Sequence, residues 1–344
     1  MAKKKRSVFL FILLVLILIA GGGYYYINTI ISSGFNINKT AYIYIDRSKN
    51  YESILIQMDT AAHVENPDGF KQLASYMKYP ENIKTGRYAI TPDMNIRQAI
   101  QMLRSGQQSP VRLTFNNMRL KKDLAERISE QLMVSESDLL LVLNDPKQAE
   151  KYGFYNETFA AMFIPNTYEV YWDISIDNFL KRMSSEYKIF WTDGRKAKAT
   201  NVGLSLIEVS ILASIVEEEC YFADEYPIVA GLYLNRLKRG QLLQADPTVK
   251  YAVGDFTLQR VLNRHLEVDS PYNTYKYAGL PPGPIRIPSI KGIDAVLNPT
   301  KHGYLYMCAK EDFSGRHNFA VTHAEHERNA ARYRRALNER RIFK

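Results

Sequence analysis

The chain has 344 residues, of which 46% are hydrophobic and 24% are charged. This apolar content is enough for a packed core, which excludes wholesale disorder, and the length is typical of about two domains. Its 18 Gly and 14 Pro follow no period and no internal repeat occurs, so collagen-like and solenoid architectures are excluded as well.

The net charge of +9 is concentrated at the two ends of the chain. Residues 3–6 are Lys-Lys-Lys-Arg, residues 328–344 are rich in Arg and Lys, and the sequence between them is close to neutral. Nucleic-acid-binding domains carry their basic residues on the folded surface. The distribution therefore argues against a nucleic-acid partner.

A stretch without any charge, Val8–Ile27, predicts a transmembrane helix, because about 20 apolar residues span a hydrocarbon core of about 30 Å. The basic cluster just before it favours a cytoplasmic tail at residues 1–7, with the rest of the chain in the periplasm or otherwise outside the inner membrane. A cleaved signal peptide is the alternative, because residues 20–23 are Ala-Gly-Gly-Gly.

Residues 28–40 are predicted to form a linker, and residues 41–110 a small α/β module. Within the module, 41–45 and 86–90 are predicted strands, and 93–104 is an amphipathic helix that Gly106 ends. Modules of this size can bind glycan strands.

Residues 111–344 are predicted to form a larger domain of mixed helices and short strands, so the fold class is α+β. The sequence contains no GxxxxGK[ST], GxGxxG or GxSxG motif, which argues against phosphate-binding loops and a nucleophile elbow. Cys220 and Cys308 match no metal-ligand spacing; they are predicted to be buried hydrophobic residues, and a disulfide between them stays open.

The helix that follows Leu204 carries the most information. Ser205 and Glu208 predict a capping box at its start, and the segment from Leu206 to Val216 is apolar nearly all round, as in a central buried helix. It ends in three consecutive glutamates, residues 217–219, where the negative end of the helix dipole disfavours acidic side chains.

A carboxyl group beside an apolar core, two like charges and a negative helix end has a raised pKa, which suits a general acid. The three glutamates are about 100° apart on the helix, so they cannot share one face. A solvated acidic helix end is the alternative interpretation.

A second helix is predicted over Asp224–Arg239, with Gly240 as its stop. Asp246 is predicted to be the N-cap of a third helix, with Pro247 at the first helical position. Two polar, aromatic loops follow at 270–275 and 279–284, and their tyrosines and asparagine suit either a sugar-binding groove or tight surface turns.

These segments resemble the endolytic murein transglycosylases. The resemblance covers nearly the whole chain and rests on Ala213-Ser-Ile-Val-Glu-Glu-Glu219, Tyr233-Leu-Asn-Arg-Leu237, Leu243-Gln-Ala-Asp-Pro-Thr-Val249, Tyr272-Asn-Thr-Tyr275, Gly279-Leu-Pro-Pro-Gly283, Pro165-Asn-Thr-Tyr168 and His317-Asn-Phe319. It implies that the module at 41–110 is LysM-like and that 111–344 is the catalytic domain. The family commonly has Lys where this chain has Glu218, and Thr where it has Cys220.

The resemblance implies that Glu219 is the catalytic acid and that no metal or cofactor takes part. It implies cleavage of the β-1,4 bond between MurNAc and GlcNAc within peptidoglycan strands, with 1,6-anhydro-MurNAc ends as products, which limits glycan length. Peptidoglycan synthases become candidate partners. The residues it assigns to substrate binding are Glu217, Gln244, Asp246, Tyr272, Asn273, Tyr275, His317 and Asn318.

Two further functions come from other classes. A non-catalytic, glycan-binding scaffold protein is the main alternative, whereas a pyridoxal-phosphate lyase conflicts with the membrane anchor. A metal triad of His317, His323 and His326 is disfavoured, because Thr322 and Glu325 predict a capping box that starts a basic helix over about 323–341.

Overall fold

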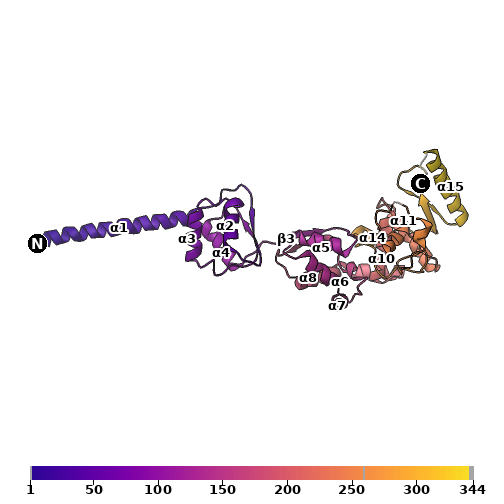
Figure 1. The fold of residues 1–344 in the computed structure, drawn as a ribbon, viewed down its shortest axis with the longest axis horizontal. Coiled ribbons are helices and arrows are strands. Elements are labelled where there is room, and N and C mark those ends of the chain that lie inside the picture. Colours follow the sequence, from indigo (N-terminus) through magenta and orange to yellow (C-terminus); the bar gives the residue numbers. More distant parts are fainter. Residues whose placement is uncertain (1, 259, 341–344) are drawn as a thin grey trace. The chain divides into compact units, whose positions relative to one another are not determined.

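The structure is a computed structural model that describes residues 2–258 and 260–340. Helices dominate, and the described residues form three two-stranded sheets, β1–β2, β3–β4 and β5–β6, which confirms the predicted α+β class (Figure 1). The elements in chain order are α1 (Ala2–Ser32), β1 (Ala41–Ile45), α2 (Tyr51–Thr60), α3 (Pro67–Tyr76), β2 (Gly86–Ile90), α4 (Ile96–Ser105), β3 (Val111–Phe115), α5 (Lys121–Ser129), α6 (Glu136–Asn144), α7 (Pro146–Lys151), the 3₁₀ helix η1 (Phe159–Met162), β4 (Asn166–Val170), α8 (Ile176–Phe190), α9 (Asp193–Val202), α10 (Leu206–Glu219), α11 (Tyr226–Lys238), α12 (Asp246–Val253), α13 (Asn263–Leu266), α14 (Ile290–Leu297), β5 (Tyr306–Ala309), β6 (His317–Ala320) and α15 (His323–Glu339).

The chain divides into two compact units. The first runs from the N-terminal helix to Leu113 and adds Gln131–Met133 and Tyr168–Ile174. The second comprises Thr114–Glu130, Val134–Thr167 and the chain from Ser175 onward.

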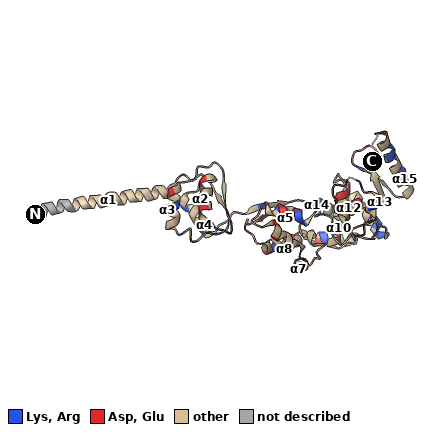
Figure 2. Ribbon diagram, viewed as in Figure 1, with Lys and Arg blue, Asp and Glu red and all other residues tan. Residues whose placement is uncertain are grey.

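Helix α1 is the membrane-span candidate of the first unit. Its segment Phe9–Ser32 has a mean hydropathy of 2.3 and is long and apolar enough to cross a membrane. Figure 2 shows this part of α1 free of charged residues. Residues 28–32, predicted to begin a linker, are helical instead, and Ile30 is buried. No Pro or Gly follows Ile27 within the helix to stop it.

The rest of the first unit is a small module built on an antiparallel pair of strands. β1 and β2 occupy the predicted residues and pair from Ala41 opposite Ile90 to Ile45 opposite Gly86. Helix α4 begins three residues later than predicted, because Asn95 accepts a hydrogen bond from the Gln98 amide and acts as the N-cap. Gly106 ends α4 in the left-handed conformation, with φ 78°.

Helix α10 lies in the core of the second unit, as its composition predicts. Ser205 and Glu208 form the predicted capping box, and all residues from Val209 to Glu217 are buried. The surrounding core includes Trp191, Leu212, Tyr233 and Ile293. A buried, capped helix is a rigid support for the side chains at its end.

The helices after α10 differ from the prediction at their starts. Helix α11 begins at Tyr226, with Glu225 as N-cap, two residues after the predicted start. The prediction that Asp246 is an N-cap is wrong: Ala245 holds the N-cap position of α12 and Asp246 is its first helical residue. Thr322 caps α15 as predicted, and position 341 lies outside the described residues.

Candidate active site

The three glutamates at the end of α10 point to three different surroundings. Successive helical side chains are rotated by about 100°, so a run of three reaches three neighbouring elements. Glu217 contacts the start of α14, Glu218 contacts two arginines, and Glu219 contacts Tyr233. Only Glu219 among them lines the cavity described below.

Glu217 is a buried structural carboxylate. Its Oε1 and Oε2 atoms accept hydrogen bonds from the Ser289 backbone amide at 3.0 and 3.2 Å, and the Ser289 hydroxyl donates to Oε1. Arg286 lies 3.7 Å from Oε2. Ser289 is the N-cap of α14, where the positive end of the helix dipole favours an anion. Glu217 thus fastens α10 to α14.

Glu218 is held between two arginines. Nη2 of Arg119 lies 2.7 Å from Oε2, and Nη1 of Arg286 lies 2.7 Å from Oε1. The Glu218 side chain is only 16% exposed, so both charge-assisted bonds are partly desolvated. A carboxylate in this position serves as an ion-pair partner.

Glu219 has the surroundings of a general acid. The Tyr233 hydroxyl donates to its Oε1 at 2.7 Å. The pKa of Glu219 is raised to about 7, chiefly by burial and to a smaller extent by the charge of Asp246. The Tyr233 bond, Lys250 and Arg236 lower the pKa but do not outweigh burial. The carboxyl group can therefore both give and take a proton near neutral pH.

A cavity of about 260 Å³ lies over the Glu219 carboxyl group. It is lined by residues from α10, α11, α12, β5, β6 and the intervening loops: Glu219, Leu232, Tyr233, Arg236, Leu243, Gln244, Asp246, Tyr275, Met307, Cys308, Ala309 and His317. Four predicted substrate-binding residues, Gln244, Asp246, Tyr275 and His317, thus meet at the predicted acid.

Asp246 and Tyr275 form one wall of the cavity. The Tyr275 hydroxyl donates to Asp246 Oδ1 at 2.6 Å, and burial, followed by this bond, raises the pKa of Tyr275. Arg236 lines the cavity beside Gln244. Its guanidinium donates to the Gln244 side chain at 3.3 Å and to the Leu243 carbonyl at 2.9 Å. Gln244 has a φ of 49°, so this loop is held in a left-handed conformation that such bonds must stabilise.

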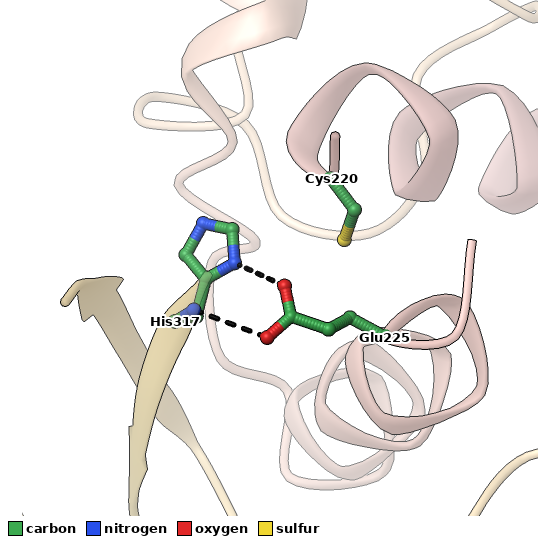
Figure 3. Close-up of side chains that lie close together, drawn as sticks. All are labelled: Cys220, Glu225 and His317. Carbon is green, nitrogen blue, oxygen red and sulfur yellow. Dashed lines mark hydrogen bonds and ion pairs between the residues drawn. The ribbon is translucent and has the colours of Figure 1, made fainter. Parts of the chain in front are cut away.

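His317 enters the cavity from β6 and is oriented by a buried acid (Figure 3). Its Nδ1 lies 3.0 Å from Oε2 of Glu225, and its backbone amide donates to Oε1 at 3.1 Å. Glu225 is only 5% exposed. The carboxylate favours the tautomer with a proton on Nδ1, and it fixes the ring plane.

The other predicted substrate-binding residues do not line this cavity. Asn273 is fully buried, and its side-chain amide donates to the carbonyls of Leu266 and Val268. Tyr272 packs on Tyr251, with ring centroids 4.7 Å apart, beside a different cavity. The Asn318 amide donates to Glu311 at 2.7 Å.

Both cysteines carry free thiols, so the disulfide left open by the sequence is absent. Sequence reasoning gave no role to Tyr233, Arg236 or Glu225. The first two occur in the Tyr233–Leu237 segment, where hydrophobic and helical patterning explains them fully. Glu225 looks like an ordinary acidic residue at a helix start.

Comparisons with known proteins identify a family and several similar proteins. The model of the YceG-like family matches residues 43–332. A Bacillus subtilis protein named endolytic murein transglycosylase is 30% identical over 288 residues, which cover 78% of this chain and 79% of that protein. A Streptococcus pneumoniae protein of the same name is 25% identical over 341 residues, covering 89% of this chain and 61% of its own length.

A solved structure shows the same fold. The crystal structure of a yceG-like protein from Listeria monocytogenes superimposes with a TM-score of 0.55 at 27% sequence identity, covering 84% of this chain and 99% of that one. The family model spans residues 43–332 and so covers most of the first unit and all of the second up to residue 332. The chain belongs to the YceG-like family.

Proposed function

We propose that this protein is an endolytic murein transglycosylase. It cuts the β-1,4 bond between MurNAc and GlcNAc within a peptidoglycan strand and leaves a 1,6-anhydro-MurNAc end. The observation that supports this most strongly is the carboxyl group of Glu219, which faces a polar cavity with a pKa of about 7. The names of the Bacillus and Streptococcus relatives support the choice of substrate.

In the first step, the protonated Glu219 carboxyl group gives its proton to the glycosidic oxygen, and the GlcNAc side leaves as an alcohol. Ordinary retaining glycosidases place a second carboxylate about 5–5.5 Å away as the nucleophile. Here the N-acetyl group of the substrate takes that part, so a single acid suffices.

In the second step, the Glu219 carboxylate removes the proton of the MurNAc C6 hydroxyl. The oxygen of that hydroxyl attacks C1 of the same sugar. The 1,6-anhydro ring closes without water, and Glu219 is protonated again for the next cycle. A pKa of about 7 serves both steps, because the group is neither too weak an acid nor too weak a base near neutral pH.

The cavity residues divide into contact and positioning roles. Gln244, Asp246, Tyr275 and His317 contact the glycan, because their side chains line the cavity around Glu219. Tyr233 orients the acid and Glu225 orients His317. Glu217 accepts a hydrogen bond from the Ser289 amide at the start of α14, and Asn273 accepts one from the Tyr275 amide. Because these bonds hold α14 and the loop at Tyr275 in place, we assign both residues to positioning.

Helix α1 anchors the enzyme in the inner membrane, with residues 1–7 in the cytoplasm and the catalytic domain outside. In that location it cuts nascent strands beside the peptidoglycan synthases and limits their length. A reporter fused after Lys344 that works only when exported tests this orientation. A reporter that works only in the cytoplasm would contradict it.

The reaction itself is tested with the purified full chain in detergent and purified murein. We expect soluble and insoluble fragments with 1,6-anhydro-MurNAc ends. Reducing MurNAc ends would show a hydrolase instead, and binding to murein without any cleavage would show the scaffold function.

A further inference from the structure

Three side chains with metal-binding atoms converge beside the cavity, from three separate elements (Figure 3). Cys220 follows the last residue of α10, Glu225 is the N-cap of α11, and His317 begins β6. One ligand atom of each lies within 4.8 Å of the other two. Cys220 and Glu225 are each only 5% exposed.

We propose that Cys220, Glu225 and His317 bind a divalent transition-metal ion of the zinc class, and that the bound ion inhibits glycan cleavage. The binding is independent of the function proposed above, whereas the inhibition rests on it. The ion would use the Cys220 thiolate, a Glu225 carboxylate oxygen and Nδ1 of His317, the ring nitrogen that faces Glu225 (Figure 3).

The donor set selects the metal. Thiolate, imidazole and carboxylate together suit zinc, whereas magnesium and calcium prefer sites made wholly of oxygen. Bonds of about 2.0–2.3 Å in a tetrahedron place the ligand atoms about 3.3–3.8 Å apart. The three atoms here are already within 4.8 Å of one another, so small side-chain movements complete the site. Three protein ligands leave the fourth position to water.

The charges around the thiol favour a cation. The carboxyl groups of Glu219, Asp224 and Glu225 all act electrostatically on the Cys220 thiol. Of the cationic groups nearby, Arg316 pairs with Asp224 at 2.9 Å. On binding, the thiol proton passes to solvent and the neutral His317 ring takes the tautomer that is protonated on Nε2. The dication then balances the charges of the Cys220 thiolate and the Glu225 carboxylate.

Inhibition follows from the place of His317. Its ring lines the cavity and is oriented by the Glu225 hydrogen bond. A metal ion bound to Nδ1 of His317 and to the Glu225 carboxylate replaces that hydrogen bond and draws the imidazole toward Cys220. Even a small movement of this kind changes the orientation in which the His317 ring meets the glycan.

Cobalt binding tests the site directly, without a murein assay. We expect the purified full chain in detergent to bind one Co²⁺ and to show a thiolate-to-cobalt charge-transfer band in the near ultraviolet. Cys220→Ser and Cys220→Ala should both lose the band, and Cys308→Ser, the matched control, should keep it. Thermal melts confirm that each variant is folded. Absence of the band in the parent chain, or its loss only in Cys308→Ser, would overturn the proposal.

Zinc inhibition is the second measurement. Zn²⁺ should suppress the release of anhydro ends at least tenfold in the parent chain and leave Cys220→Ser active. Equal inhibition of both chains would overturn the inhibitory role. If no variant cleaves murein even without zinc, the proposed function fails, while the cobalt spectra still decide the metal site.

Discussion

The hydroxyl of Tyr233 donates a 2.7 Å hydrogen bond to Oε1 of Glu219, and this bond joins α11 to the last residue of α10. Tyr233 is buried and cannot turn away, so the carboxyl group has one favoured orientation. The bond lowers the pKa of Glu219 while burial raises it, and burial dominates, which gives a value of about 7. The Tyr233 hydroxyl therefore affects both the orientation and the pKa of the Glu219 carboxyl group.

The pH dependence of cleavage follows from this pKa. The first step needs the protonated form of Glu219, so kcat/KM should fall as pH rises through about 7, by about tenfold for each further pH unit. Release of anhydro ends from murein between pH 5 and 9 measures it. A rate that stays constant up to pH 9 would contradict a general acid with this pKa.

Tyr233→Phe should move the alkaline limb of that profile to higher pH. Loss of the hydroxyl removes a bond that stabilises the carboxylate, so the pKa of Glu219 rises. Turnover should also fall, because the carboxyl group loses its orienting partner. Tyr277→Phe is the matched control, since it removes an exposed tyrosine–aspartate bond at Asp269. Identical pH profiles for the parent chain and Tyr233→Phe would exclude this role.

Asp246→Asn should shift the alkaline limb in the opposite direction. The charge of Asp246 raises the pKa of Glu219, so the neutral amide lowers it, and the effect should be largest at low salt. Asn can still accept the Tyr275 bond, so stability should change little. Asp246→Ala loses the acceptor too, and its free energy of unfolding should be lower by about 0.5–1.5 kcal/mol. Equal pH profiles for Asp246→Asn and the parent chain would show that the charge of Asp246 does not act on Glu219.

Glu217→Ala should act mainly on stability. The substitution leaves the Ser289 amide without its acceptor in a buried place, at a cost of about 1–3 kcal/mol in the free energy of unfolding. Glu217→Gln keeps one acceptor oxygen and should cost less. Thermal or denaturant unfolding measures both. If Glu217→Gln kept full stability but its kcat fell at least a hundredfold without a change in KM, Glu217 would be a catalytic residue instead of a positioning one.

The sequence allowed the main helix to be predicted, because its start and its burial depend on local patterns. The choice of Glu219 among the three glutamates came from the family resemblance, and its catalytic role stays a prediction. Ser205 and Glu208 mark the start of α10, and its apolar composition marks burial. What each glutamate contacts could not be predicted. The partners of Glu217 and Glu218, namely Ser289 and Arg119 with Arg286, lie far away along the chain.

The same limit explains the error at Asp246. An Asp before Pro is a common helix N-cap, but which residue becomes the N-cap depends on the contacts of the loop that leads into the helix. Here the Ala245 amide donates to the hydroxyl of Thr274, and Tyr275 from the same loop takes the Asp246 carboxylate. Glu225 was missed for a similar reason, because its partner His317 comes from a strand near the end of the chain.

Glu219→Gln should be more stable than the parent chain at neutral pH. The folded pKa of about 7 lies above the ordinary value of 4.5, so the folded state binds the proton more tightly than the unfolded chain does between these pH values. Stability of the parent chain therefore falls as pH rises from about 4.5 to 7, by up to about 3 kcal/mol, and the neutral amide removes this loss. Melting temperatures of both chains at pH 5 and pH 7.5 measure it, and a difference that does not grow with pH would contradict a raised pKa.

The most direct test of the account is the release of 1,6-anhydro-MurNAc ends from purified murein by Glu219→Gln and Glu218→Gln. The rate of cleavage by Glu219→Gln should fall by about 10⁴-fold or more. General acid–base catalysis contributes about 10²–10⁴-fold, and here one group performs both proton transfers. Glu218→Gln should keep most of its activity, since Glu218 pairs with Arg119 and Arg286 and does not line the cavity. An active Glu219→Gln enzyme beside an inactive, folded Glu218→Gln enzyme would contradict the assignment of Glu219 as the catalytic acid.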